Sequence, residues 1–301
     1  MKVHYIGDVH LGKKFNQGVP LHRRGEREAL VLSQFANYEL RMPDVDLTVQ
    51  VGDLFDAMVV PYSVVWAAAQ AYLDAPGKHV VLRGNHDASR DLDKVSAFQI
   101  FAGLVRPHGV IVVEDEPVRI EDHVFIPWHP FIDAEGMVED YKHIIQGATV
   151  AVSHYDVTGS TTNLVPKKSL EALGIQQIVT GHDHTPRIIG NIRVVGSMQP
   201  YSHGEDPTGR FYITTTLDDL PDDVTNKCVR LVLGPGEEVP DLDCLQLQVV
   251  REGEEGVEME VDFEAFDLSA LFNQAVEQVG LGNGMAASAL QKLEEFRAAG
   301  T

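Results

Sequence analysis

The sequence of 301 residues contains only two cysteines, Cys228 and Cys244, and they do not form a CxxC pair. A disulfide framework is therefore not indicated. No apolar run approaches 18 residues, so the sequence predicts no membrane-spanning helix. Met1-Lys2 leads directly into an apolar run without the pattern of a signal peptide. We therefore expect a cytoplasmic protein that makes no contact with a membrane.

Basic residues are also scarce, since 24 Lys and Arg stand against 45 Asp and Glu, which gives a net charge of -21. Residues 211–301 contain 19 of the acidic residues and five of the basic ones. Such an acidic segment repels nucleic-acid phosphate, so DNA would have to be held by the first two thirds of the chain or by another subunit. The alternative is that the acidity only keeps the protein in solution.

The first 200 residues alternate between apolar strand-like runs and helical patterns, which predicts an α/β domain. A hairpin is expected between residues 110–113 and 118–126, which would make the sheet mixed. The helices are expected at Glu26–Leu40, Tyr62–Leu73, Lys94–Leu104 and Ala134–Ile145.

The pattern changes after about residue 205. Strands are expected near 211–216, 228–233 and 245–250, followed by two amphipathic helices at Asp267–Val279 and Met285–Ala299. We therefore predict two domains, residues 1–205 and a smaller α+β module at 206–301.

Five short polar segments each follow an apolar, β-branched run. Polar side chains at the ends of buried strands can converge from distant parts of a sequence. Any one of these segments is weak evidence, but five in this order predict a common site. The segments are Asp8-Val9-His10, Gly52-Asp53-Leu54-Phe55-Asp56, Gly84-Asn85-His86-Asp87, Ser153-His154 and Gly181-His182-Asp183-His184.

The donor types in these segments indicate a metal centre. Carboxylate, imidazole and amide groups without a thiolate favour manganese, iron or zinc over a structural zinc cage. There are more donors than one ion needs, so the sequence predicts two ions, about 3.5–4 Å apart, that bind and activate a phosphate ester. Asp56 either supports a ligand or caps the next helix.

The order DxH, GDxxD, GNHD, H, GHxH resembles that of the calcineurin-like metallophosphoesterases. The resemblance implies a four-layer sandwich, with two mixed β-sheets face to face and helices outside. It implies that Asp8, His10, Asp53 and His184 hold one ion, and that Asp53, Asn85, His154 and His182 hold the other. It also implies that His86 contacts the phosphate and protonates the leaving oxygen, with Asp87 orienting its ring.

Three stretches are more specifically similar to the SbcD-type DNA-repair nucleases: residues 7–14, the Gly52–Asp56 segment and residues 196–202. That similarity implies manganese-dependent cleavage of DNA, an SbcC-type coiled-coil ATPase partner, a C-terminal capping module and a homodimer. Magnesium, iron(II) and zinc remain alternatives for the metal. For the dimer, we expect the exposed faces of the helices at Glu26–Leu40 and Lys94–Leu104 to be used.

A basic cluster follows the first ligand pair on a predicted loop. It would clamp the phosphate backbone of DNA, or it would be an ordinary solvated loop. Its members that we consider for substrate binding are Lys13, Lys14, Arg23 and Arg24.

Two other functions fit the same segments. The site could serve a small-molecule metallophosphatase or a cyclic-nucleotide phosphodiesterase. The domain could also be a metal-stabilised scaffold for a partner ATPase, although a scaffold needs no proton donor such as His86.

Overall fold

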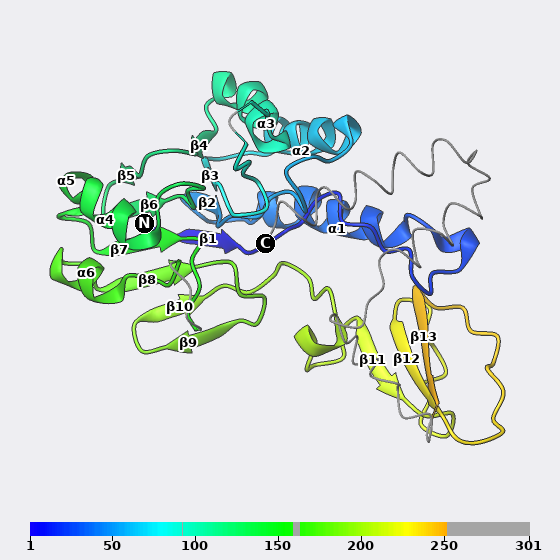
Figure 1. The fold of residues 1–301 in the computed structure, drawn as a ribbon. Helices are drawn as coiled ribbons and strands as arrows, with labels where there is room; N and C mark the ends of the chain where they lie inside the picture. Colours follow the sequence, from blue (N-terminus) through cyan, green and yellow to red (C-terminus); the bar gives the residue numbers. More distant parts are fainter. Residues whose placement is uncertain (92, 159–162, 252–301) are drawn as a thin grey trace, which may run out of the picture. The chain divides into compact units, whose positions relative to one another are not determined.

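The computed structural model describes residues 1–91, 93–158 and 163–251 (Figure 1). Met1–Leu233 and Glu238–Val250 form one compact unit, and a second unit lies mostly outside the described residues. The helices expected at Asp267–Val279 and Met285–Ala299 also lie outside them. The predicted division after residue 205 stays a prediction.

The first sheet has four strands in the order β1-β2-β3-β4, and its neighbouring strands are all parallel. Along β3, Val80 and Leu82 pack toward the second sheet, whereas Val81 packs with the helices. Because both faces of the sheet are covered, its strands are mostly apolar, as is usual for parallel sheets. The strands are β1 (Val3–Ile6), β2 (Leu47–Gln50), β3 (His79–Leu82) and β4 (Ile111–Val113).

The second sheet is mixed and has six strands in the order β5-β6-β7-β8-β10-β9. Its central strands are parallel, and antiparallel pairs lie at the two edges. The strands are β5 (Val118–Ile120), β6 (His123–Ile126), β7 (Val150–Ser153), β8 (Gln177–Thr180), β9 (Arg187–Ile189) and β10 (Ile192–Val194).

The hairpin is not where the sequence pattern placed it. β4 belongs to the first sheet, and residues 114–117 carry the chain across to the second. The hairpin instead joins β5 and β6 through a turn at Glu121, whose φ of 53° is left-handed. The segment expected as one strand at residues 118–126 therefore contains two strands and the turn between them.

Three apolar cores separate four layers. One core lies between the first sheet and helices α1, α2 and α3, a second lies between the two sheets, and a third lies between the second sheet and helices α4, α5 and α6 (Figure 1). This arrangement confirms the predicted sandwich. The helices are α1 (Glu26–Asn37), α2 (Tyr62–Asp74), α3 (Ala97–Val105), α4 (Ala134–Asp140), α5 (Lys142–Ile145) and α6 (Lys167–Ala172).

Helix ends differ from the expected ones for local reasons. Ser96 caps α3 and forms a capping box with Gln99, so the helix begins after Ser96 and not at Lys94. The segment expected as one helix to Leu40 ends as α1 at Asn37 and continues as a short 3-10 helix. The 3-10 helices are η1 (Leu21–Arg23), η2 (Glu39–Arg41), η3 (Arg106–His108) and η4 (His203–Glu205).

A three-stranded sheet follows, in the order β11-β12-β13. Its small core includes Val229 and Leu231 from β12, and both cysteines are buried and free. Among the helices that the structure describes, none combines the length and apolarity needed to cross a membrane. The strands are β11 (Tyr212–Thr215), β12 (Cys228–Leu233) and β13 (Gln246–Arg251).

Candidate metal centre

The five polar segments meet at one edge of the two sheets. Three of them follow β1, β2 and β3, and two follow β7 and β8. These strands are parallel to their neighbours within each sheet, so the carboxyl ends of each set lie together. All seven predicted ligands converge there, as the contacts below show.

The first ligand group contains Asp8, His10 and His184, whose donor atoms lie within 4.8 Å of one another. The Nε2 atoms of His10 and His184 are 3.1 Å apart, and His184 Nε2 lies 3.5 Å from Asp8 Oδ2. Asp8 and His10 are buried. These converging donors form a site for one cation.

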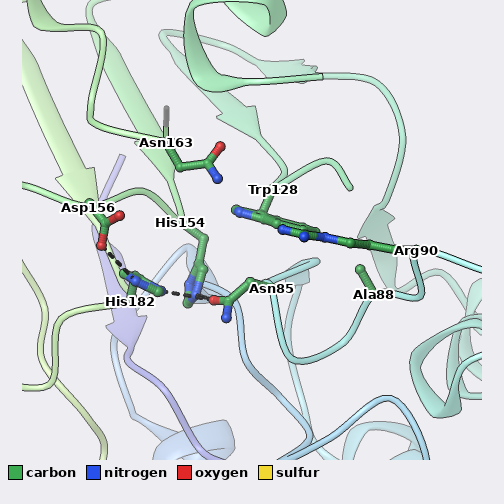
Figure 2. Close-up of a pocket in the computed structure, with 8 residues that line it drawn as sticks. All are labelled: Asn85, Ala88, Arg90, Trp128, His154, Asp156, Asn163 and His182. Carbon is green, nitrogen blue, oxygen red and sulfur yellow. Dashed lines mark hydrogen bonds and ion pairs between the residues drawn. The ribbon is translucent and has the colours of Figure 1, made fainter. Parts of the chain in front are cut away.

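The second group contains Asp53, His154 and His182, again within 4.8 Å. Asn85 joins them, because its Oδ1 lies 3.0 Å from His154 Nε2 and 2.9 Å from His182 Nδ1 (Figure 2). Asp53 Oδ2 lies 3.3 Å from His154 Nε2 and 3.9 Å from His10 Nε2. Asp53 thus stands between the two groups, where a bridging ligand belongs.

The backbone is strained at three of these ligands. His10, Asp53 and His182 have φ angles of 48°, 53° and 73°, in the left-handed region that L-residues rarely adopt. Such strain persists only where the surrounding structure fixes it, and it is concentrated at functional sites. At Gly84, a Cβ atom would lie 2.2 Å from Asp53 Oδ1, so the close approach of the two segments requires glycine.

The residues fit divalent cations. Asp8 Oδ2 is buried without a hydrogen-bond partner, although most buried polar atoms in proteins have one. Oxygen and imidazole donors suit manganese, iron or zinc. Within the described chain, the donor groups contain no thiol.

The charges of the site favour a cation as well. Burial lowers the pKa of His10 to about 4. Burial acts in the same direction at His154, but the carboxylates of Asp53 and Asp8 outweigh it and raise the His154 pKa to about 9. At His184, Asp8 and Glu205 likewise overcome burial and raise the pKa to about 10. The carboxylates therefore stabilise positive charge in both groups.

Each ligand histidine is also held through its second ring nitrogen. The carbonyl of Val51 lies 2.9 Å from His154 Nδ1, and Asp56 Oδ1 lies 3.5 Å from His10 Nδ1. Asp56 thus lies beside His10 and not at the N-cap position of α2, which is Pro61.

Two of these supporting carboxylates were missed by the sequence interpretation. Asp156 Oδ1 lies 2.7 Å from His182 Nε2, and Glu205 Oε2 lies 3.2 Å from His184 Nδ1. Such contacts fix which nitrogen faces a metal. The position of Asp156 two residues after His154 was the only sequence signal for either.

His86 lies at the exposed mouth of the site, with its ring centroid 4.9 Å from that of His10. The carbonyl oxygen of Asp56 lies 2.6 Å from His86 Nδ1 and orients the ring. Asp87, which was expected to do this, has other partners: its buried carboxylate accepts hydrogen bonds from the backbone N–H groups of Gly84, Leu54 and Phe55. Asp87 therefore ties two ligand segments together.

The basic cluster does not act as one surface. Lys13 lies 3.3 Å from Asp56, beside His10. Arg23 is buried, and its guanidinium binds Glu26, Asp243 and the carbonyl of Thr225. These partners, and not a substrate phosphate, use its donors. Lys14 and Arg24 are exposed, and no described contact joins either to the ligands.

A cavity of about 370 Å³ opens from the second ligand group (Figure 2). Asn85, His154 and His182 form one wall, and Trp128 and Arg90 form the opposite wall. Neither Trp128 nor Arg90 belongs to the strand-end pattern, so the sequence interpretation missed both.

Comparison with known proteins agrees with this geometry. Residues 1–186 match the model of the calcineurin-like phosphoesterase family. No curated protein matches the chain. The matched residues include all seven expected ligands and end two residues after His184. The chain therefore belongs to the calcineurin-like phosphoesterase family, and it is a metal-dependent phosphoester hydrolase.

Proposed function

We propose that this chain is a two-metal phosphodiesterase that hydrolyses DNA, as an exonuclease or endonuclease of the SbcD type. The observation that carries this proposal is the cavity, which continues past the metal ligands to Trp128 and Arg90. A phosphate monoester needs no wall on that side. A diester has a second substituent on phosphorus, and the cavity provides room and contacts for it.

The ligand assignment follows the two groups. Asp8, His10 and His184 would hold one ion, Asn85, His154 and His182 would hold the other, and Asp53 would bridge them. Two bound divalent ions supply an activated water and neutralise the negative charge that develops on the phosphate. Burial of Asp8, His10, Asp53 and His154 keeps competing water away from these donors.

His86 would protonate the leaving oxygen. The Asp56 carbonyl accepts a hydrogen bond from Nδ1, which leaves Nε2 as the nitrogen available to the substrate. The ring is exposed at the mouth of the site, so a bound substrate can reach it.

The position of the late SbcD-like stretch, residues 196–202, supports the narrower assignment. The Tyr201 ring centroid lies 5.4 Å from that of His10 and 5.7 Å from that of His184. Met198 N donates to the carbonyl of Asp8 at 3.0 Å. A motif that resembles the nucleases thus packs directly against the first ligand group.

The proposal is tested with purified full-length protein and manganese on linear duplex DNA, single-stranded DNA and bis-p-nitrophenyl phosphate. We expect all DNA cleavage to depend on manganese and to disappear in Asp53→Asn, which controls for a contaminating nuclease. Hydrolysis of the small diester with both DNA substrates intact would overturn the DNA assignment.

A small-molecule phosphodiesterase or phosphatase is the second candidate, and the charge of the chain favours it. A net charge of -21 repels a polyanion more strongly than a small ester. Assays with p-nitrophenyl phosphate and a cyclic nucleotide beside DNA compare the candidates directly. This second function would be favoured if kcat/KM for either small substrate exceeded kcat/KM for DNA, with the DNA concentration counted as the concentration of ends.

We propose manganese as the metal. The protein is stripped with a chelator and reloaded separately with manganese, magnesium, iron(II) or zinc. We expect the chelated protein to lose activity and manganese to restore the highest turnover. Higher turnover with zinc or iron(II) would contradict this choice.

We also propose a homodimer. An apolar patch lies on α2, α3 and the loops before them, and it surrounds a groove of about 390 Å³. Neither helix contains a charged residue, apart from Asp74 at the C-terminal end of α2. Two copies of an acidic chain repel each other least through such a face. The exposed residues of the patch are Val59, Tyr62, Trp66, Val95 and Ile100.

Light scattering after gel filtration tests the dimer. We expect two copies for the wild-type protein and one for Trp66→Glu, while Tyr38→Glu, on an exposed residue after α1, serves as the control. A monomeric wild-type protein would refute the dimer. A monomeric Tyr38→Glu would move the interface toward α1.

The SbcC-type ATPase partner and the capping role of residues 206–301 rest on the motif resemblance. We propose both. Co-purification with a coiled-coil ATPase that is lost when residues 285–301 are deleted would support the partner, and unchanged co-purification would place its contact elsewhere.

A further inference from the structure

The far wall of the cavity beside the second ligand group has polar groups without partners. Figure 2 shows the nitrogen end of the Trp128 indole directed into the space beside His154. Trp128 is 6% exposed, and among the residues described no acceptor is hydrogen-bonded to its indole N–H. The indole N–H lies in the cavity lining, where it is available to donate to a ligand.

The backbone holds Trp128 in place. Its N–H donates to the carbonyl of Arg83 at 3.0 Å, and its own carbonyl accepts from Arg83 Nε at 3.1 Å. The indole itself packs in the core between the second sheet and its helices, so it is held in place before any ligand arrives, which lowers the entropic cost of binding.

Arg90 supplies a charge at the same wall. Its guanidinium lies 6.0 Å from the centre of the indole ring, and it has no ion pair or hydrogen bond with the described part of the chain. Arg83, which also contacts Trp128, is bound to Asp115 at 2.9 Å. Of these two arginines, Arg90 lines the cavity and has no carboxylate partner among the described residues, whereas the Arg83 charge is paired.

The chemistry of this wall selects an anion. The indole N–H and the guanidinium are donors without an acceptor function. The acidic residue of the lining, Asp156, is paired with His182 at 2.7 Å, which reduces its repulsion of an anion. An arginine beside a fixed N–H suits the oxygens of a phosphate.

We propose that Trp128 and Arg90 form a subsite for a second phosphate group of the substrate, next to the phosphate at the metals. This inference rests on the proposed function, because a second phosphate near the first is a property of a nucleic-acid strand. The subsite would position the strand and favour substrates with more than one phosphate.

Short thymidine substrates isolate this contact. TpT contains one phosphate, whereas pTpT and TpTp add a terminal phosphate on one side or the other. We expect the wild-type protein with manganese to show a higher kcat/KM for one of the two phosphorylated dimers than for TpT. Which of them is preferred would also show on which side of the cleaved bond the subsite lies.

Two variants then test the residues. Arg90→Gln removes the charge, and Trp128→Phe keeps a ring but removes the N–H. For each variant we expect a smaller ratio of kcat/KM for the preferred dimer to kcat/KM for TpT. The reduction should be roughly tenfold for Arg90→Gln, since the lost hydrogen bond is charge-assisted. Lys168→Gln, on an exposed lysine outside the cavity lining, is the matched control for charge.

The outcomes separate the two proposals. A wild-type protein without any preference among the dimers, or a preference that survives both variants, overturns the subsite while DNA hydrolysis stands. Hydrolysis of bis-p-nitrophenyl phosphate with neither the thymidine dimers nor the DNA substrates cleaved overturns both. A thermal melt and metal analysis of each variant show that a lower ratio does not come from misfolding.

Discussion

Two buried aspartates in different regions of the molecule show what distinguishes a site from a structural contact. Asp8, at the strand-end site, has one carboxylate oxygen bonded to His182 N at 3.2 Å and the other without a hydrogen-bond partner. Asp206, before the third sheet, accepts hydrogen bonds from Thr208 and from three backbone N–H groups. A buried acid that the chain itself satisfies stabilises the fold, whereas one left open needs a ligand.

The comparison implies that substitutions in the two regions have different effects. At the strand ends they should reduce metal content and turnover. Near the third sheet they should reduce the free energy of unfolding and leave metal content unchanged.

Asp53→Asn should have the largest effect on activity, because Asp53 alone lies between both ligand groups. We expect kcat/KM to fall much further than the about 10–100-fold loss that follows mutation of a residue behind a metal ligand. Metal analysis should show that both ions bind more weakly. Retention of two tightly bound ions would show that Asp53 is not the bridge.

His86→Ala should reduce kcat by about 10²–10⁴, the usual contribution of a general acid. Metal content should remain at the wild-type value, since His86 would protonate the leaving group and not hold an ion. The decisive measurement compares the loss of kcat for DNA with the loss for an ester that has a good leaving group, such as p-nitrophenol, which needs no proton from an acid. If the loss is equally large for that ester and for DNA, His86 is not the acid.

Asp156→Asn and Glu205→Gln form a matched pair. Each removes a carboxylate charge behind one histidine, His182 in the second group and His184 in the first. We expect about 10–100-fold weaker binding of one ion in each variant. Metal titration should show one weakened site of two, and the double variant should show both. Simultaneous weakening of both ions by either single change would mean that the groups do not bind independently.

The sequence was sufficient for the layers and for the convergence of the seven expected ligand residues, because buried strands have apolar runs and these residues follow them directly. It was insufficient where residues far apart in the chain meet. Arg23 lies in a basic cluster, but its carboxylate partner Asp243 is 220 residues away. Asp87 is next to His86 in sequence, yet its carboxylate points to the backbone of the neighbouring segment.

The same limit explains the missed residues. Glu205 and Trp128 belong to segments without a ligand motif, and only tertiary packing brings them to the centre. The turn at Glu121 was hidden because no glycine, proline or asparagine marked it, although its backbone is left-handed. Residue types thus predict chemistry well where the strand itself positions them.

Asp206→Ala should have the smallest effect on activity and should test the other side of the comparison. Removal of an acceptor that serves Thr208, Phe211 and Tyr212, among others, should lower the free energy of unfolding by about 1–3 kcal/mol. Asp206→Asn keeps one acceptor oxygen, so its free energy of unfolding should fall by less. Urea unfolding measures both variants, and metal content and turnover should match the wild-type protein.

The pH dependence of this difference follows from the Asp206 pKa. Burial alone would raise the pKa, but hydrogen bonds from the Tyr212, Phe211 and Arg210 N–H groups outweigh it and hold it at about 2. An unfolded aspartate has a pKa of about 3.9. The stabilisation is therefore fully present above about pH 4 and is lost as the pH falls through 2. The difference in the free energy of unfolding between the wild-type protein and Asp206→Ala should be constant at neutral pH and become smaller in acid. A difference that becomes larger in acid would mean that Asp206 is protonated in the native protein.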